Sequence, residues 1–282
     1  MTPEQTEQYF INELSFIYED EEARQLFYLT LEHISGWNRS KYLSSKREVF
    51  SDDTKQKYLE VLNDLKKGRP MQHIFAEAHF YGLKFKVNES VLIPRPETEE
   101  LIYWMLTDLT AAGVEQLDVL DIGTGSGCIA ITLKKKTTFS NVFALDVSAD
   151  AIAVARENAV LNDAAVNFIQ ADIRSYEASQ KFHVIVSNPP YIRNSERSEM
   201  HQNVLDYEPH LALFVSDDDP LIFYTSIADF ALSHLHTSGR LFFEINEYLG
   251  AQTVEMLAVK GFKNIILKKD MQGKDRMIGC NI

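Results

Sequence analysis

The sequence has little cysteine and no long hydrophobic run. Its 282 residues include two cysteines, Cys128 and Cys280, and both lie in apolar segments. This pattern predicts reduced core thiols and excludes a small secreted domain held together by disulfides. No apolar run approaches the ~18 residues of a membrane-spanning helix. The opening "MTPEQTEQYF" also lacks the basic and apolar regions of a signal peptide. We therefore expect a cytoplasmic protein with no membrane partner.

Basic residues are also in short supply. The chain has 28 lysines and arginines against 41 aspartates and glutamates, so its net charge is −13. A surface of this sign repels phosphate backbones, and we expect no direct nucleic-acid binding. The length suits two domains better than one. A composition of 45% hydrophobic and 24% charged residues is ordinary for a globular protein.

The N-terminal part predicts a small helical domain over residues 1–75. Apolar residues in "EARQLFYLTLEHI" recur at helical spacing. Ser51 is placed to cap a later helix, "DDTKQKYLEVLNDLKKG", which Gly68 ends. The apolar stripes are typical of core packing, and the segment carries no catalytic signature. We expect this domain to pack against or bind another molecule.

A β-hairpin linker is predicted over residues 76–95. Apolar side chains alternate there with period two, and "NES" is a plausible turn into a second strand, Val91–Ile93. The alternating residues are Tyr81, Leu83, Phe85 and Val87. Pro96 then begins a helix whose acidic first turn suits the positive end of the helix dipole. The predicted buried stripe of this helix is Leu101, Trp104, Met105 and Leu109.

Residues 96–282 predict an α/β domain. Strands alternate with helices such as Ala149–Val160, which predicts a mostly parallel sheet covered on both faces. The predicted strands are Leu117–Ile122, Asn141–Val147, Val166–Gln170, Phe182–Ser187 and Arg240–Ile245. Two further strands, Asn264–Leu267 and Arg276–Cys280, are joined by a segment too short for a crossover. The last strand is therefore expected to be antiparallel.

A glycine-rich turn follows the first of these strands in "VLDIGTGSGCIAI". Without Cβ atoms, such a turn can bring backbone N–H groups close to a ligand. Part of the turn satisfies the dinucleotide pattern G-x-G-x-x-A, but that pattern leaves Gly123 unexplained. The full pattern is D-x-G-x-G-x-G. The cofactor-binding residues that it predicts are Asp121, Gly123, Thr124, Gly125, Ser126 and Gly127.

Acidic residues also follow the next two strands. Asp146 ends the second strand, where a carboxylate can hold both ribose hydroxyls of an adenosine; the alternative is a plain turn residue. Asp172 and Ile173 follow the third strand in "QADIR", near the expected position of an adenine ring. The sequence leaves open whether Asp172 contacts the cofactor or caps a helix.

The absence of other motifs narrows the choice of cofactor. A P-loop would require Gly-Lys-Ser/Thr, which is missing. A nicotinamide enzyme has no need of Asn-Pro-Pro-Tyr after the fourth strand. S-adenosylmethionine has no phosphates and carries a sulfonium charge, which suits acidic residues such as Asp121. We therefore expect S-adenosylmethionine as the cofactor, S-adenosylhomocysteine as its product, and no metal.

The stretch "VIVSNPPYI" ends the fourth strand abruptly. Pro189 and Pro190 cannot donate to a strand ladder, and each holds the preceding residue extended. This places Asn188 at the carboxyl edge of the sheet, where the ligand site of an open parallel sheet lies. The side-chain oxygen of Asn188 and a main-chain carbonyl can converge there on one NH₂ group. Tyr191 can stack on the flat group that bears it.

Such an arrangement suits methyl transfer to a weakly nucleophilic nitrogen. The lone pair of an amide or arylamine nitrogen is delocalised, and two acceptors favour the pyramidal, more positive nitrogen of the transition state. They also aim the nitrogen at the methyl carbon, and the proton can leave after attack. The alternative is a structural turn with a buried tyrosine. The predicted catalytic and substrate-binding residues are Asn188, Pro189, Pro190 and Tyr191.

With these motifs in place, the sequence resembles the HemK/PrmC family, the peptide chain release factor N(5)-glutamine methyltransferases. "GRPMQHI" is similar to that family's G-x-P-x-Q-Y-I linker, and "VLIPRPETEELI" is similar to its most specific signature. The family's further motifs follow in the expected order as "DIGTGSG", "NPPYI", "YEP" and "GKDRMI". The resemblance covers nearly the whole chain.

The resemblance implies a class I, Rossmann-like methyltransferase domain preceded by a helical domain that docks the substrate. It implies methylation of the glutamine in the Gly-Gly-Gln motif of peptide chain release factors, which are then the protein partners. The implied cofactor contacts are Gly123–Gly127, Asp146, Ile173 and Asn188. The implied substrate contacts are Asn188–Tyr191, and we add Arg95 from the signature to this set.

The chain departs from the family pattern at a few positions. His73 stands where the family has tyrosine, and "SDDDP" replaces a turn that contains glycine. "EIN" at Glu244–Asn246 replaces E-I-G, and Ile173 is less aromatic than many relatives at the adenine face. None of these departures removes a predicted catalytic group.

Two other functions fit part of the pattern. Asn-Pro-Pro-Tyr also suits the exocyclic amine of a flipped adenine, so a DNA adenine methyltransferase is an alternative. That function predicts a basic cleft and a DNA-reading domain, and the net charge of −13 argues against it. A non-catalytic cofactor-binding module would predict loss of Asn188 or of the glycine turn, and both are intact.

Overall fold

The computed structural model describes residues 1–112, 117–137 and 140–282, and the chain divides into two compact units. The first unit comprises Met1–Ala76 and His201–Tyr207, and the second comprises Glu77–Met200 and Glu208–Ile282. The hairpin linker thus belongs to the second unit, and the short segment His201–Tyr207 belongs to the first. Among the described helices, none is long and apolar enough to cross a membrane.

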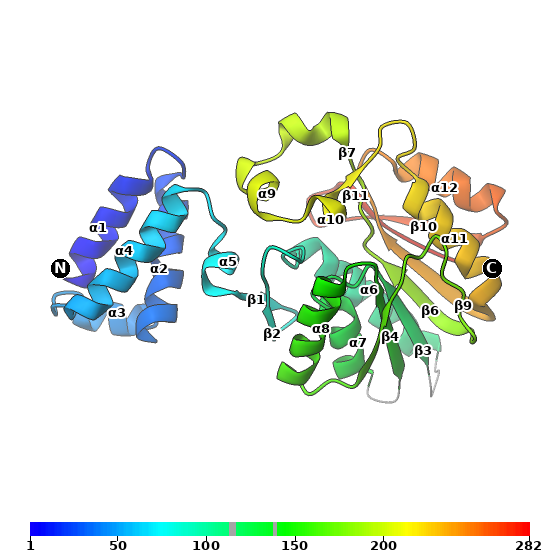
Figure 1. Ribbon diagram of the computed structural model, residues 1–282, viewed down its shortest axis with the longest axis horizontal. Helices are drawn as coiled ribbons and strands as arrows, with labels where there is room; N and C mark the ends of the chain where they lie inside the picture. Colours follow the sequence, from blue (N-terminus) through cyan, green and yellow to red (C-terminus); the bar gives the residue numbers. More distant parts are fainter. Residues whose placement is uncertain (113–116, 138–139) are drawn as a thin grey trace. The chain divides into compact units, whose positions relative to one another are not determined.

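The first unit is a bundle of helices around an aromatic core (Figure 1). Phe27 lies at its centre and makes an edge contact with Phe10 at 5.6 Å between ring centroids. Ser51 caps a helix as predicted, because its hydroxyl accepts a hydrogen bond from the backbone N–H of Thr54 at 3.1 Å. The helices of this unit are α1 (Pro3–Leu14), α2 (Asp20–Ser35), α3 (Arg39–Ser45), α4 (Asp52–Lys66), α5 (Met71–Phe75) and α9 (Gln202–Tyr207).

The hairpin lies earlier in the chain than predicted. Its strands are β1 (Glu77–Phe80) and β2 (Leu83–Lys86), and they pair antiparallel with Phe80 opposite Leu83. The two residues between them have positive φ values, 50° at Tyr81 and 77° at Gly82, which is the backbone of a type I′ turn. The prediction that "NES" forms the hairpin turn and that residues 91–93 form its second strand is therefore wrong.

The second unit is built on a seven-stranded sheet. The strand order is β10-β11-β9-β6-β3-β4-β5, and β9, β6, β3, β4 and β5 run parallel to one another. The last strand of the chain, β11, is antiparallel as predicted, although it lies inside the sheet between β9 and β10. The strands are β3 (Asp118–Ile122), β4 (Asn141–Asp146), β5 (Val166–Gln170), β6 (Phe182–Ser187), β9 (Leu235–Glu244), β10 (Lys263–Lys269) and β11 (Asp275–Asn281).

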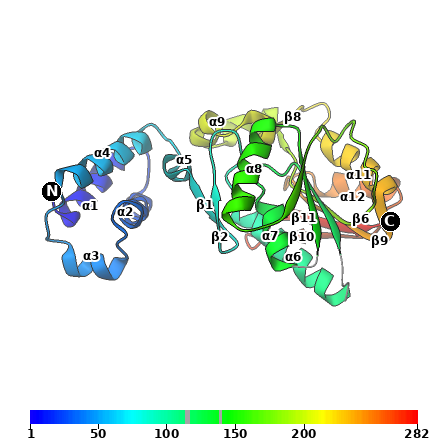
Figure 2. The ribbon, with the colours of Figure 1, turned by 60° about the horizontal axis from the view of Figure 1, so that its bottom comes forward.

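Helices cover both faces of this sheet (Figure 2). Successive strand residues alternate between two apolar cores, so that Val119 packs in one and Leu120 in the other. One core is shared with α6 and α7, and the other with α11 and α12. The helices of this unit are α6 (Pro96–Ala112), α7 (Cys128–Lys136), α8 (Ala149–Leu161), α10 (His210–Leu213), α11 (Ile222–His234) and α12 (Gly250–Val259), with the 3₁₀ helix η1 (Asn194–Glu199).

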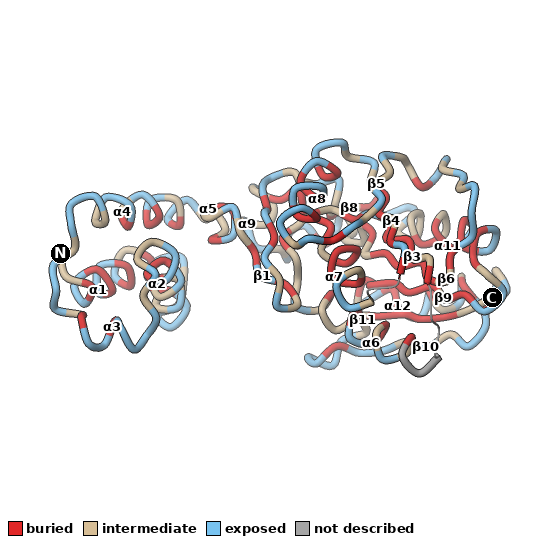
Figure 3. The backbone as a smooth tube through the Cα atoms, turned by 90° about the horizontal axis from the view of Figure 1, so that it is seen from below, coloured by how far each residue is buried: buried red, intermediate tan, exposed pale blue. Residues whose placement is uncertain are grey.

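The central strands are buried along most of their length (Figure 3). Helix α6 begins at Pro96 as predicted, and its four predicted stripe residues are all buried. Trp104 of that stripe meets Phe242 of β9 edge to face at 5.4 Å. A separate two-stranded sheet, β7 (Ile192–Arg193) with β8 (Phe214–Val215), follows the Asn-Pro-Pro-Tyr stretch. The central parallel strands are thus mostly apolar and buried, and the segments that follow them carry polar residues.

A substitution in the hairpin turn tests the pairing register of β1 and β2. We expect Gly82→Ala to lower the free energy of unfolding by about 1–2 kcal/mol, because alanine is strained at positive φ. A Cβ atom at Gly82 meets nothing within 4 Å, so no steric clash adds to the strain. Gly82→Asn should cost less, since asparagine tolerates this backbone. Urea unfolding measures both variants, and equal stability of Gly82→Ala and the wild type would contradict the turn.

Candidate active site

The carboxyl ends of β6, β3, β4 and β5 meet at one edge of the sheet and line an open cavity. All residues that line it belong to the second unit. The predicted site residues on its wall are Arg95, Gly123, Thr124, Gly125, Ser126, Asp146, Asp172, Ile173, Asn188, Pro189 and Pro190. The remaining predicted residues, Asp121, Gly127 and Tyr191, do not line it. The fold thus gathers most of the predicted residues around one cavity.

The glycine turn between β3 and α7 has a backbone that other residues adopt poorly. Its three glycines all have positive φ values, and Gly127 has the largest, 82°. A Cβ atom at Gly127 would lie 2.9 Å from Cδ1 of Ile131 and 3.2 Å from Cβ of Ala155. Gly127 is therefore needed for close packing behind the turn. Gly123 to Ser126 face the cavity.

Asp121 supports the glycine turn through hydrogen bonds. Its carboxylate oxygen Oδ2 accepts hydrogen bonds from the Thr124 hydroxyl at 2.6 Å and from the Ala130 backbone N–H at 3.2 Å. The side chain is fully buried, and burial raises the pKa of the Asp121 carboxyl to about 7. The structure therefore places Asp121 behind the glycine turn and off the cavity wall.

Asp146 lies on the cavity wall at the end of β4. Its Oδ2 accepts the backbone N–H of Gly125 at 2.9 Å, and its Oδ1 accepts that of Ser148 at 2.9 Å. These bonds fix the carboxylate between the glycine turn and the start of α8. Burial raises the pKa of the Asp146 carboxyl, and the backbone donors oppose that shift. Each oxygen has a second lone pair that can accept from a ligand.

Asp172 and Ile173 lie on the wall after β5. The Arg174 guanidinium is 2.5 Å from the Asp172 carboxylate, and this pairing lowers the pKa of the Asp172 carboxyl. The Arg174 backbone N–H also donates to Asp172 Oδ1 at 3.0 Å. Asp172 thus heads a turn and not a helix, so the helix-cap interpretation is wrong. Ile173 is buried and contributes an apolar surface to the cavity.

Asn188, Pro189 and Pro190 reach the cavity from the end of β6. The preceding residue, Ser187, ties this end to β3 because its hydroxyl donates to the carbonyl of Ile122 at 2.7 Å. The Asn188 side-chain nitrogen Nδ2 donates to the Thr98 hydroxyl at 3.3 Å. The Asn188 amide is therefore anchored at its nitrogen end.

Tyr191 packs against the core shared with α11 and α12. Its hydroxyl donates to Oε1 of Glu244 at 3.2 Å, and burial next to this carboxylate raises the pKa of the Tyr191 hydroxyl. The Tyr191 carbonyl accepts from Asn246 Nδ2 at 3.0 Å. Asn246 also donates to Glu196 at 3.0 Å, so the asparagine that departs from E-I-G secures the segment after the prolines.

Arg95 is held at the cavity by Glu208 of the "YEP" stretch. The Arg95 guanidinium donates to Glu208 Oε1 at 2.5 Å, and the backbone N–H of Ile93 donates to Oε2 at 3.1 Å. Glu208 itself is buried. The segment after the hairpin is thus tied to residues more than a hundred positions later in the chain.

Three polar residues at the site were not assigned by the sequence analysis: Thr98, Glu208 and Glu244. Thr98 lines the cavity, and the other two hold residues that line it or lie next to it. Glu244 ends a parallel strand, and the rule that ligands bind beyond such strand ends could have identified it. The partner of Glu208 lies too far along the chain for any local pattern to reveal.

Asp121 predicts a pH dependence of stability. Its pKa is raised in the folded state to about 7, so between about pH 4 and pH 7 the folded state binds more protons than the unfolded state. The stabilisation is therefore present at low pH and is lost as the pH rises through that window. We expect Asp121→Asn to lose less stability than the wild type between pH 5 and pH 8.

Asp172→Asn serves as the matched control, because the pKa of Asp172 is lowered, so its contribution to stability changes only below about pH 4 and stays constant from pH 5 to pH 8. Urea unfolding across this pH range measures all three proteins. Parallel pH profiles for Asp121→Asn and the wild type would contradict the assignment.

Each of the two parts of the chain matches a known protein family. Residues 5–75 match the PrmC N-terminal domain, and residues 103–208 match the Methyltransferase small domain. A solved methyltransferase from Pyrococcus furiosus is 18% identical, with a TM-score of 0.52 over 77% of this chain and 98% of that one. The human methyltransferase 10 domain containing protein is 18% identical, with a TM-score of 0.51 over 71% and 89%. These structural likenesses show the fold.

Sequence relatives show more than the fold. A release factor glutamine methyltransferase from Flavobacterium psychrophilum is 47% identical over 96% of both chains. Another, from Bacteroides thetaiotaomicron, is 40% identical over 97% of this chain and 98% of the relative. Identity of this extent spans the helical unit, the cavity and the strands behind it. The chain belongs to the release factor glutamine methyltransferase family.

Proposed function

We propose that this protein transfers a methyl group from S-adenosylmethionine to the side-chain amide nitrogen of the glutamine in the Gly-Gly-Gln motif of peptide chain release factors. The observation that carries the proposal is the anchored Asn188 beside the glycine turn, in a chain 47% identical to a release factor glutamine methyltransferase. The relatives are named for glutamine methylation, so they do not support the DNA adenine alternative.

The residues on the cavity wall fit S-adenosylmethionine. A ribose needs an acceptor, and Asp146 presents a carboxylate whose orientation is already set by Gly125 and Ser148. An adenine ring needs an apolar surface, and Ile173 provides one. A Cβ atom at Gly125 would meet nothing within 4 Å, so the turn leaves room for a ligand. When bound, the cofactor supplies an electrophilic methyl carbon.

The Asn-Pro-Pro segment would hold the glutamine amide. With its nitrogen bound to Thr98, the Asn188 side chain presents its oxygen Oδ1 as an acceptor. Together with a main-chain carbonyl of the segment, this oxygen can take the two hydrogens of an NH₂ group. Acceptance by both favours the pyramidal nitrogen of the transition state. Arg95 lies on the same wall and can contact the peptide around the glutamine.

We assign the roles of the domains in the same way. Residues 1–75 would dock the release factor, residues 76–95 would act as a linker, and residues 96–282 would carry out the transfer. The first unit has its own aromatic core, and the cavity lies within the second unit. A macromolecular substrate needs more contact than one glutamine side chain, and the helical unit is the part of the chain without another role.

The cofactor assignment predicts an effect of Asp146. We expect Asp146→Ala to weaken binding of S-adenosylmethionine by roughly 1.5–3 kcal/mol, the usual worth of hydrogen bonds to a charged group. Asp150→Ala is the matched control, because Asp150 is exposed in the first turn of α8. Calorimetry measures both variants. Unchanged affinity in Asp146→Ala would remove this residue from the cofactor site.

The substrate assignment predicts where a labelled methyl group goes. After incubation with methyl-labelled S-adenosylmethionine, we expect label on a release factor and none on duplex DNA. A release factor whose Gly-Gly-Gln glutamine is replaced should take no label. Label on DNA alone would overturn the proposal.

Asn188 variants test in the same assay whether this side chain contributes to methyl transfer. We expect kcat to fall by about 10²–10³ in Asn188→Ala, by analogy with loss of one preorganised hydrogen-bonding group. Asn188→Asp should keep more activity than Asn188→Ala, because its carboxylate retains the acceptor that faces the cavity, although it loses the hydrogen bond that Asn188 donates to Thr98. Near-wild-type turnover in both variants would show that Asn188 has only a structural role.

A further inference from the structure

We propose that Thr98 and Glu244 are positioning residues that set the orientation of the Asn188 side-chain amide. The inference rests on the proposed function, because it concerns which end of the Asn188 amide faces the substrate. It starts from a continuous chain of hydrogen bonds. Asn188 Nδ2 donates to Thr98 Oγ1 at 3.3 Å, and Thr98 Oγ1 donates to Glu244 Oε2 at 2.6 Å.

The direction of these bonds follows from the number of hydrogens. A threonine hydroxyl has one hydrogen, and an ionised carboxylate can only accept. Because Thr98 gives its hydrogen to Glu244, it can only accept from Asn188. It therefore selects the NH₂ end of the Asn188 amide. The oxygen end remains for the cavity, and among the described residues no protein group donates to it.

The reversed amide would be wrong for the reaction. Turning the Asn188 side chain would place its oxygen against a Thr98 oxygen with no hydrogen between them. It would also point an NH₂ group at the substrate NH₂ group, where an acceptor is needed. The buried pair Thr98 and Glu244, 2% and 1% exposed, thus decides the polarity of an amide whose two ends have nearly the same shape.

Glu244 controls both ends of the Asn-Pro-Pro-Tyr segment. One carboxylate oxygen binds Thr98 and through it Asn188, and the other accepts the Tyr191 hydroxyl at 3.2 Å. The Tyr224 hydroxyl donates to the backbone carbonyl of Glu244 at 3.2 Å, which fixes the end of β9. A single side chain therefore spans the segment that would hold the substrate amide.

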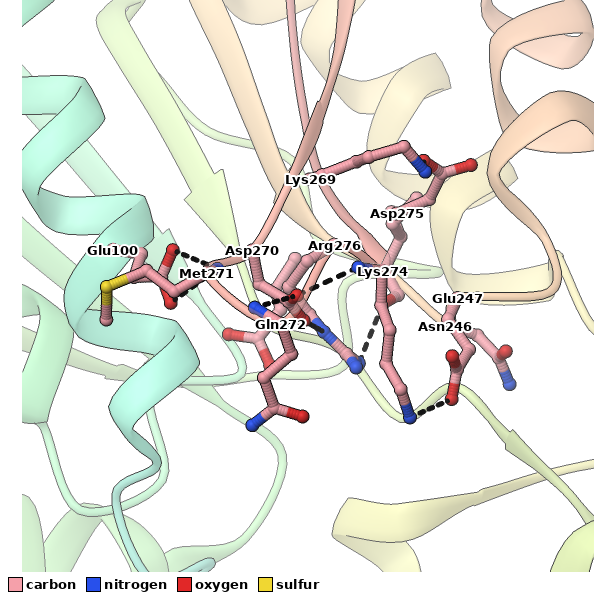
Figure 4. Close-up of polar contacts among 12 residues, drawn as sticks. Glu100, Asn246, Glu247, Lys269, Asp270, Met271, Gln272, Lys274, Asp275 and Arg276 are labelled. Atoms are coloured by element: carbon pink, nitrogen blue, oxygen red, sulfur yellow. Dashed lines mark hydrogen bonds and ion pairs between the residues drawn. The ribbon is translucent and has the colours of Figure 1, made fainter.

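Burial and neighbouring groups act in opposite directions on the ionisation of Glu244. Burial raises the pKa of the Glu244 carboxyl, while the Thr98 hydrogen bond and the nearby Arg276 act to lower it. Arg276 is held by Asp270 at 3.2 Å and by the carbonyl of Ile245 at 3.4 Å. Figure 4 shows Asp270 at the base of the turn between β10 and β11, next to Arg276.

The turn around Asp270 is itself closed by several bonds. Asp270 Oδ1 accepts the backbone N–H groups of Gln272 and Lys274, at 3.0 and 2.9 Å. Met271 is tied to Glu100 in α6, the helix that carries Thr98 (Figure 4). The "GKDRMI" stretch thus holds the Arg276 guanidinium against the buried carboxylate of Asp270.

Matched threonine variants test the inference. Thr98→Val keeps the shape but removes the hydroxyl, and we expect kcat for release factor methylation to fall by about 5–10-fold, the worth of one hydrogen bond. Thr98→Ser keeps the hydroxyl and should stay near the wild type. Thr107→Val is the control for the same change at an exposed position of α6. The calorimetric affinity for S-adenosylmethionine should be the same in all of them.

A double variant separates positioning from general destabilisation. If Thr98 acts through Asn188, Thr98→Val should cause no further loss of kcat in the Asn188→Ala background. Additive losses would overturn the inference. Glu244→Gln provides a second test. Its amide no longer compels Thr98 to donate, so this variant should also lower kcat without changing the affinity for the cofactor. Wild-type kcat in both Thr98→Val and Glu244→Gln would equally overturn it.

An NMR measurement makes the result independent of catalysis. The Asn188 side-chain NH₂ signal, assigned by its absence in Asn188→Ala, should shift in Thr98→Val and Glu244→Gln and stay in place in Thr98→Ser and Thr107→Val. A signal that does not move in Thr98→Val would overturn the positioning role. If the wild type does not methylate a release factor while the NH₂ signal behaves as expected, the proposed function fails and the positioning geometry stands.

Discussion

Parallel pairing of β6, β3, β4 and β5 is the constraint on which the candidate site depends. Strands that run in one direction deliver whatever follows them to the same edge of the sheet. The glycine turn, Asp146, Asp172 and Asn188 therefore meet although they are spread over about a quarter of the chain. The two apolar cores hold the register, because a shift of one residue would exchange the faces of a strand and bury the wrong side chains.

Buried acids do much of the positioning within this frame. The net charge of −13 would by itself indicate an acidic surface, yet several carboxylates point inward and accept hydrogen bonds from loops. Asp121 holds the glycine turn, Glu208 holds Arg95, and Glu244 holds the Asn-Pro-Pro-Tyr segment. A carboxylate suits this task because it accepts several short, charge-assisted bonds at once. The raised pKa values of the Asp121 and Glu244 carboxyls reflect the cost of burying them.

Local patterns predicted most elements of the second unit but misplaced the hairpin. An alternation of apolar and polar residues with period two has the same appearance whether or not a short turn interrupts it. It therefore could not locate the turn between Phe80 and Leu83. The deciding factors were the positive φ values at Tyr81 and Gly82 and the contact between Phe80 and Phe85 at 6.0 Å. Likewise, the short link between β10 and β11 predicted that β11 is antiparallel. Only the pairing of β11 with β9 decided that β11 lies inside the sheet.

The sequence by itself determined the residues whose role is local. The glycine turn, the prolines that stop β6 and the acids that follow the strands could be read in order, because their backbone preferences and their distance from a strand end are properties of short segments. Only the tertiary structure decided which groups these residues meet. Thr98 lies 90 residues from Asn188 and 146 from Glu244, and Glu208 lies 113 from Arg95. Hydrogen bonds of this kind depend on sub-ångström placement by the packed sheet and helices, and no short stretch of sequence specifies that placement.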